Sequence, residues 1–86
     1  MAPKYTVDHI RSEVKKLMAD LGDLAADQIT DTANFADDLG LDSLRAMELM
    51  VSVEKKYGIV IPEEEFGGIR NVNEAVAAVQ RHLADV

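Results

Sequence analysis

The fold of this 86-residue chain is decided by one stretch, Asp42-Ser43-Leu44-Arg45-Ala46-Met47-Glu48-Leu49-Met50-Val51-Ser52-Val53-Glu54-Lys55-Lys56-Tyr57-Gly58. Its apolar residues recur at helical spacing, which predicts a helix from Ser43 to Tyr57. Asp42 is a favourable N-cap, because its carboxylate accepts a free backbone N–H and suits the positive end of the helix dipole. Gly58 can end the helix, since glycine readily takes the left-handed conformation found there.

This helix has two apolar faces when its residues are placed about 100° apart. One set can build the core of a bundle: Ala46, Leu49, Met50, Val53 and Tyr57. On roughly the opposite side lie Leu44, Met47 and Val51, flanked by Glu48 and Glu54, and we expect them to form a partly exposed apolar strip. Such strips are typical of protein-contact surfaces. The alternative is that both faces are buried, with the preceding loop or a later helix covering the strip.

Upstream, an amphipathic helix is predicted for residues 7–21, with Thr6 as its N-cap and Gly22 as its end. The loop that follows lacks periodicity and is much longer than the typical connection of about 4–6 residues. We expect Ile29 and Phe35 to lie in the core and keep this long loop ordered.

Downstream, Ile59-Val60-Ile61 predicts a short extended segment before Pro62, and Glu63 to Phe66 can form one helical turn. The last helix begins after Asn71, where Asn71 and Glu74 have the spacing of a capping box. The sequence therefore predicts an all-α fold. It would be a small four-helix bundle of three main helices plus one short helix, with a long loop between helices one and two.

The composition and charge of the chain argue against several classes of function. Sixteen acidic residues against nine basic ones give a net charge of −7, which disfavours nucleic acid and favours basic partners. The chain has no cysteine, so we expect neither a disulfide nor a thiolate metal site. The sequence contains no recognisable pair of a nucleophile and a base, so we do not expect an enzyme. The length of the chain predicts one domain (residues 1–86), which we expect to be a monomer. No apolar run approaches the roughly 18 residues of a membrane span and no signal-peptide core is visible, so we predict a cytoplasmic location.

Ser43 is the candidate functional residue. A serine at a helix start lies among unpaired backbone N–H groups and at the positive end of the dipole, where a phosphate ester is favourable. The simpler alternative is a serine that only helps to cap the helix. As a hydrolase nucleophile it is poorly placed, because Gly40-Leu41-Asp42-Ser43-Leu44 lacks the trailing glycine of a nucleophile elbow.

The residues around Ser43 resemble the prosthetic-group attachment motif of the acyl carrier protein family. The motif is Asp42-Ser43-Leu44 after Leu39-Gly40-Leu41. The resemblance extends to Phe35-Ala36-Asp37-Asp38, to Glu48-Leu49 and to the segment from Tyr57 to Glu65. The length of the chain and its predicted helices are also similar to those of the family.

This resemblance implies that Ser43 accepts 4′-phosphopantetheine from coenzyme A, added by a phosphopantetheinyl transferase. The thiol of the arm would carry acyl groups as thioesters and present them to enzymes such as a ketosynthase or an acyltransferase. A chain without cysteine can obtain a thiol only from such a group. The family binds its partners with the start and exposed side of this helix, which here carry Asp42, Leu44, Met47, Glu48, Val51 and Glu54.

Three basic residues depart from the family pattern. Arg45, Lys55 and Lys56 stand in a helix that is strongly acidic in carriers of fatty acid synthesis, so the docking face has mixed sign. We therefore predict a carrier for a specialised fatty acid, polyketide or lipid pathway, although these bases could simply pair with nearby acids. An alternative from another class is a non-carrier helical adaptor that uses the apolar strip and has no need of Ser43.

Overall fold

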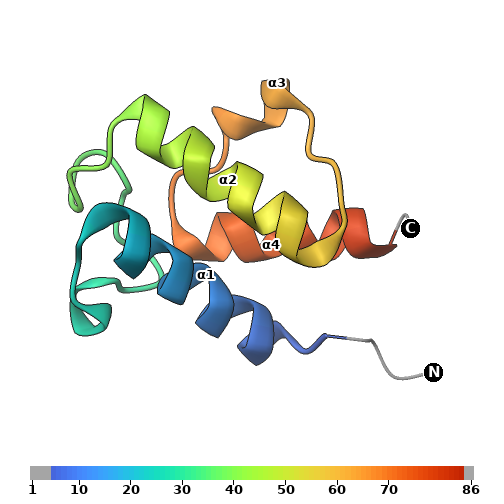
Figure 1. Cartoon of the computed structure of the whole chain (residues 1–86), viewed down its shortest axis with the longest axis horizontal. Helices are drawn as coiled ribbons and strands as arrows, with labels where there is room; N and C mark the ends of the chain where they lie inside the picture. The colour runs from blue at the N-terminus through green and yellow to red at the C-terminus, as the bar shows by residue number, and fades with distance from the viewer. Residues whose placement is uncertain (1–4, 85–86) are drawn as a thin grey trace.

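A computed structural model describes residues 5–84, which contain helices and loops and no strand (Figure 1). The elements are α1 (Val7–Gly22), a 3₁₀ turn (Ala26–Gln28), α2 (Ser43–Tyr57), α3 (Glu63–Phe66) and α4 (Val72–Ala84). Three long helices and one short one confirm the predicted all-α bundle, including the long loop before α2. None of the helices in residues 5–84 is both long enough and apolar enough to cross a membrane.

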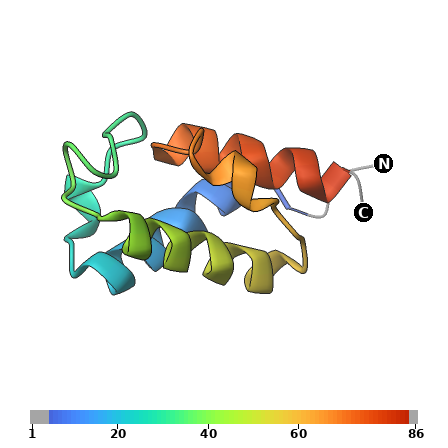
Figure 2. The same ribbon diagram turned by 90° about the horizontal axis from the view of Figure 1, so that it is seen from above.

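The core lies where the three long helices meet. α1 packs against both α2 and α4, and α2 also contacts α4. Figure 1 shows α3 on the side of the bundle away from α1, and Figure 2 shows it over the space between α2 and α4. The core side chains of the long helices are Ile10, Val14, Met18, Leu49, Met50, Val53, Tyr57, Val72, Ala75, Val76, Ala78 and Val79. Their removal from water is the main force that holds the helices together.

The ends of α1 agree with the prediction at one end only. Thr6 is the N-cap, and its hydroxyl accepts the backbone N–H of His9 at 3.0 Å. At the other end Gly22 remains helical, and Asp23 takes the left-handed conformation with φ of 53°. The predicted role of Gly22 as the helix end is therefore wrong. Its small size serves the packing instead, because a Cβ there would lie 2.9 Å from Cδ2 of Leu41.

Buried anchors keep the long loop in place. Ile29 and Phe35 are both buried, as predicted. The backbone of Phe35 also holds two segments together: its N–H donates to the carbonyl of Arg70 at 2.8 Å, and its carbonyl accepts the N–H of Leu41 at 2.8 Å. Phe35 alone thus ties the loop both to the segment before α4 and to the segment before α2.

Asp31 adds a polar tie between this loop and two helices. Its carboxylate lies 2.8 Å from Nζ of Lys15 and 3.4 Å from Nε of Arg11, both on α1. The hydrogen bond from Lys15 lowers the pKa of the Asp31 carboxyl. The carbonyl of Asp31 accepts the N–H of Asn73 at 3.1 Å, in the first turn of α4. The loop is therefore ordered by contacts to both α1 and α4.

The start of α4 contains half of the predicted capping box. Asn71 accepts the backbone N–H of Glu74 at 2.9 Å, as expected. The return bond differs, because the Glu74 carboxylate accepts the N–H of Arg70 at 2.8 Å instead of that of Asn71. The cap consequently reaches one residue farther upstream than the capping-box pattern predicts.

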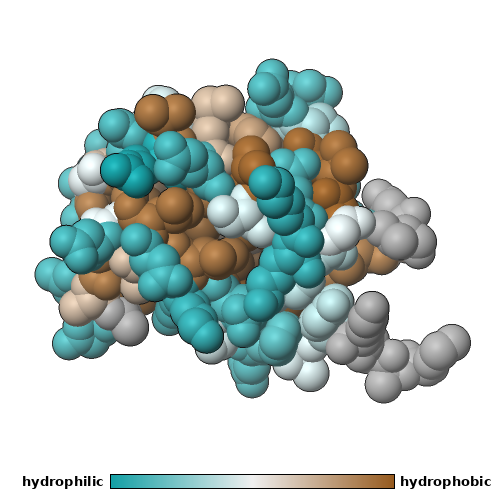
Figure 3. Space-filling model, viewed as in Figure 1, coloured by the Kyte–Doolittle hydropathy of each residue, from teal (hydrophilic) through white to brown (hydrophobic). Residues whose placement is uncertain are grey.

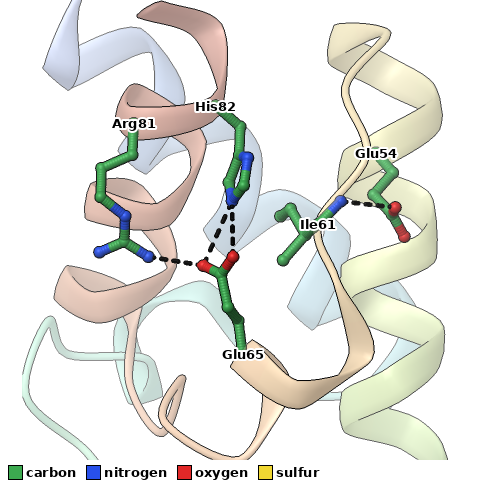
Figure 4. Close-up of polar contacts among 5 residues, drawn as sticks. All are labelled: Glu54, Ile61, Glu65, Arg81 and His82. Carbon is green, nitrogen blue, oxygen red and sulfur yellow. Dashed lines mark hydrogen bonds and ion pairs between the residues drawn. The ribbon is translucent and has the colours of Figure 1, made fainter. Parts of the chain in front are cut away.

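The segment from α2 to α3 is held at both ends (Figure 4). Ile59 and Ile61 are buried while Val60 is exposed, which fits the predicted extended segment. Oε2 of Glu54 accepts the backbone N–H of Ile61 at 2.9 Å. On α3, Glu65 contacts α4 through a 2.8 Å hydrogen bond from Arg81 and a 3.1 Å contact to Nε2 of His82. These bonds lower the pKa of Glu65, His82 having the larger effect.

Candidate functional site at the start of α2

Ser43 is placed by the three residues before it. Gly40 has φ of +70°, a conformation that glycine adopts without strain, and turns the chain toward α2. Leu41 is buried and anchors the turn. Asp42 is the N-cap of α2, because its Oδ1 accepts the backbone N–H of Arg45 at 2.8 Å. Ser43 is then the first helical residue and is exposed to solvent.

The side chain of Ser43 is exposed and makes no contact within residues 5–84 that would hold its hydroxyl. Within the described part of the chain its hydroxyl has no hydrogen-bond partner, since Asp42 supplies the side-chain cap. The alternative in which Ser43 serves to cap the helix is therefore not what the structure contains. An exposed hydroxyl at a helix N-terminus suits an esterified phosphate, because the helix dipole favours negative charge there.

A groove adjoins Ser43 between α2 and α3. It has a volume of about 380 Å³, and its lining consists of Ser43, Ala46, Met47, Met50, Glu63, Phe66, Gly67 and Ile69. A second hollow of about 200 Å³ shares Ser43 and Ala46 and extends toward Phe35 and Leu41 in the loop before α2. A chain attached at Ser43 would thus begin beside largely apolar surface. These residues fit a prosthetic group that consists of a phosphate followed by a flexible arm.

The apolar strip predicted on α2 is exposed. Leu44 is 64% exposed, Met47 40% and Val51 41%, so the alternative in which both faces are buried is wrong. On the face of the molecule seen in Figure 3, hydrophobic side chains reach the surface among hydrophilic ones. Sequence reasoning missed Val60, which is 77% exposed just beyond the end of α2. Its place between the buried Ile59 and Ile61 is the alternation that could have indicated it.

The charges that flank the strip are partly engaged inside the molecule. Nη1 of Arg45 donates to the carbonyl of Leu21 at 3.2 Å and lies 3.6 Å from Oε2 of Glu48. This bears out the simpler alternative for Arg45, a pairing with a nearby acid. Glu54, which was predicted to border the docking face, also accepts the N–H of Ile61 through its Oε2.

Lys56 pairs away from the docking face. Its Nζ lies 3.1 Å from Oε2 of Glu13 on α1, and this bond lowers the pKa of Glu13. The acid that it meets is on another helix, so the spacing along α2 could not indicate it.

Of the residues predicted to form the site, the structure brings Ser43, Leu44, Met47 and Val51 together on one open face of α2. Asp42 and Glu48 lie beside them.

Two acidic runs, Asp37-Asp38 and Glu63-Glu64-Glu65, are the segments that could attract a metal ion. Glu65 on α3 contacts Arg81 and His82 on α4, and His82 is half-buried. Among residues 5–84, no group of three or more histidine or acidic side chains is arranged to hold a metal ion.

Comparison with known proteins finds similarity over most of the chain. The family model for a phosphopantetheine attachment site matches residues 12–79. An acyl carrier protein from Rickettsia bellii is 37% identical over 76 residues, which cover 88% of this chain and 88% of that protein. A meromycolate extension acyl carrier protein from Mycobacterium tuberculosis is 34% identical over 76 residues, which cover 88% of this chain and 66% of that protein.

A solved structure is similar throughout the fold. The acyl carrier protein from Enterococcus faecalis superposes with a TM-score of 0.76 at 32% sequence identity, covering 91% of this chain and 99% of that one. The helical bundle, the free serine and the matching family model define a carrier that bears phosphopantetheine covalently and is not a catalyst. The chain belongs to the acyl carrier protein family. Membership of this family implies that the chain interacts with a phosphopantetheinyl transferase and with enzymes that process acyl groups.

Proposed function

We propose that Ser43 is the residue that bears 4′-phosphopantetheine. The observation that carries the proposal is a hydroxyl that is exposed, unbonded and first in α2, next to the groove. In the transfer, Oγ of Ser43 loses its proton and bonds to the phosphorus next to pantetheine, and adenosine bisphosphate leaves coenzyme A. The arm then supplies the thiol that a chain without cysteine lacks.

The residues around Ser43 would present this arm. Asp42 caps α2 and so holds the first helical turn in place. The groove between α2 and α3 offers apolar surface to the arm or to the first methylene groups of its cargo. Each CH₂ that leaves water there gains about 0.8 kcal/mol before any cost of opening the groove. Short cargo would thus be partly sheltered while it stays attached.

Partner enzymes would dock on the start and open side of α2. The residues proposed for this contact are Asp42, Leu44, Met47, Glu48, Val51 and Glu54. Three exposed apolar side chains form a small contact, which suits complexes that must exchange quickly. Charges at the border steer the encounter more than they add affinity. Ketosynthases and acyltransferases are the partners that we propose.

The pathway served is proposed to be a specialised one for fatty acids, polyketides or lipids. Support comes from Lys55, the base of α2 for which the described residues provide no partner, and from the similarity to meromycolate extension carriers of mycobacteria. We further propose that residues 1–86 form one carrier domain that acts as a monomer in the cytoplasm, which size-exclusion chromatography and cell fractionation would test.

Loading with coenzyme A and a promiscuous phosphopantetheinyl transferase tests the attachment residue. Intact mass should rise by one phosphopantetheine in the parent and in Ser52→Ala, a control on the same helix, and should not change in Ser43→Ala. Loading of Ser43→Ala would refute the proposal. A parent protein that is folded but stays unmodified would favour the alternative of a helical adaptor. Such an adaptor would keep its function in Ser43→Ala.

A further inference from the structure

Lys55 differs from the other two bases of α2. Arg45 is engaged with Leu21 and Glu48, and Lys56 with Glu13. Lys55 is exposed and has no ion pair or hydrogen-bond partner in the part of the chain that the structure describes. Its charge is therefore available to a second molecule.

Lys55 also lies in line with the apolar strip. Leu44, Met47, Val51 and Lys55 follow one another at intervals of three, four and four residues, which places them along one side of a helix. Leu44 and Val51 are exposed, so these side chains form a continuous exposed stripe that ends at the ammonium group of Lys55. Lys55 comes eleven residues after Leu44, about 17 Å along the axis at 1.5 Å per residue.

The charge at the other end of the stripe is negative. Asp42 is exposed at the start of α2, and Glu63 is exposed and lines the groove beside Ser43. Between the two ends, Glu48 is paired with Arg45, and Glu54 is bonded to Ile61. The open face of α2 thus has an acidic end at Ser43 and a basic end at Lys55, with apolar side chains between.

We propose that Lys55 belongs to the docking face and that the cognate partner enzyme matches this polarity. Such an enzyme has a basic patch where the arm enters at Ser43 and, opposite Lys55, an acidic side chain about 18 Å away along the helix axis, twelve residues at 1.5 Å each. An enzyme with a uniformly basic patch meets a like charge at Lys55, which slows association. Lys55 therefore selects between partner enzymes. This inference rests on the proposed attachment at Ser43, because the direction of the stripe is defined by the arm.

The test uses a housekeeping fatty acid synthase ketosynthase with a basic docking patch as the probe. All carrier variants are first loaded and their mass checked, and kcat/KM for acyl transfer is then measured at low and at physiological salt. Lys55→Glu should raise kcat/KM by about threefold to tenfold at low salt, mainly through KM, as expected for reversing one exposed charge pair. Lys55→Gln should give a smaller gain, and both gains should shrink with salt.

Lys16→Glu is the matched control, since Lys16 is exposed on α1 outside the stripe. It changes the net charge equally and should alter kcat/KM less than twofold at low salt, about the limit for an exposed charge outside a contact. Equal effects of Lys55→Glu and Lys16→Glu would overturn the docking proposal alone, because loading would still have succeeded. Failure of the parent to load would overturn it together with the attachment proposal. Helix content and melting temperature of Lys55→Gln exclude misfolding as the cause of any change.

Discussion

Replacing Asp42 by alanine should weaken the start of α2 measurably. The Asp42 carboxylate is the side-chain cap of this helix, and its Oδ1 lies 2.8 Å from the backbone nitrogen of Arg45. Alanine leaves that N–H without its partner and removes a negative charge from the positive end of the helix dipole. The first turn, which positions Ser43, is the part of the molecule that should be affected.

The size of the effect follows from these two contributions. Loss of an N-cap acceptor costs typically about 1 kcal/mol, and loss of a charge beside the dipole about 0.5 kcal/mol. The free energy of unfolding should therefore fall by about 1.5 kcal/mol in Asp42→Ala. In a domain of this length such a change lowers the melting temperature by about 6–12 °C. Asp42→Asn keeps an acceptor and loses only the charge, so its free energy of unfolding should be lower than that of the wild type by about 0.5 kcal/mol.

Thermal and urea unfolding followed by far-ultraviolet circular dichroism measure these differences. The expected order of stability is wild type, Asp42→Asn and then Asp42→Ala. A melting temperature of Asp42→Ala equal to that of the wild type would refute the capping role. Equal losses in the two variants would mean that the charge, and not the hydrogen bond, provides the stabilisation.

Two further predictions concern the long loop and the contact between α3 and α4. Ile29→Val should lower the free energy of unfolding by about 0.5–1.5 kcal/mol, because the side chain is buried, whereas the exposed Thr32→Ala should change it by less than about 0.5 kcal/mol. Equal urea midpoints for Ile29→Val and wild type would show that the loop is not anchored. The pKa of Glu65 is lowered in the folded state, chiefly by its bond to His82, so its stabilising effect is present above its ordinary pKa of 4.5 and is lost as pH falls through the folded value. Glu65→Gln should therefore lose less stability on acidification than the wild type, and parallel urea midpoints between neutral pH and pH 3 would contradict this assignment.

The sequence predicts features that depend on neighbours along the chain. The bounds of α2, its cap at Asp42 and its end at Gly58 are all confirmed, because capping and helical periodicity are local. The exposed strip is also confirmed, since positions along a helix determine which side chains share a face. The resemblance around Ser43 is confirmed at the level of the family.

Features that depend on distant residues could not be predicted in this way. The partner of Lys56 is Glu13 on another helix, and the partners of Glu65 lie on α4. Gly22 looked like a helix end, but the close approach of Leu41 explains the glycine. In each case the cause is a tertiary contact, and a pattern within one segment carries no information about it.

Mapping the modified residue in loaded wild-type protein tests the central claim most directly. Trypsin cleaves after Lys16 and Arg45, and the peptide between them, residues 17–45, contains Ser43 as its only serine. The other two serines, Ser12 and Ser52, fall in separate peptides. We predict that tandem mass spectrometry finds phosphopantetheine on residues 17–45, with fragment ions that place it on Ser43. Its presence on either other peptide, or its absence from all three in a folded and fully loaded sample, would contradict the account.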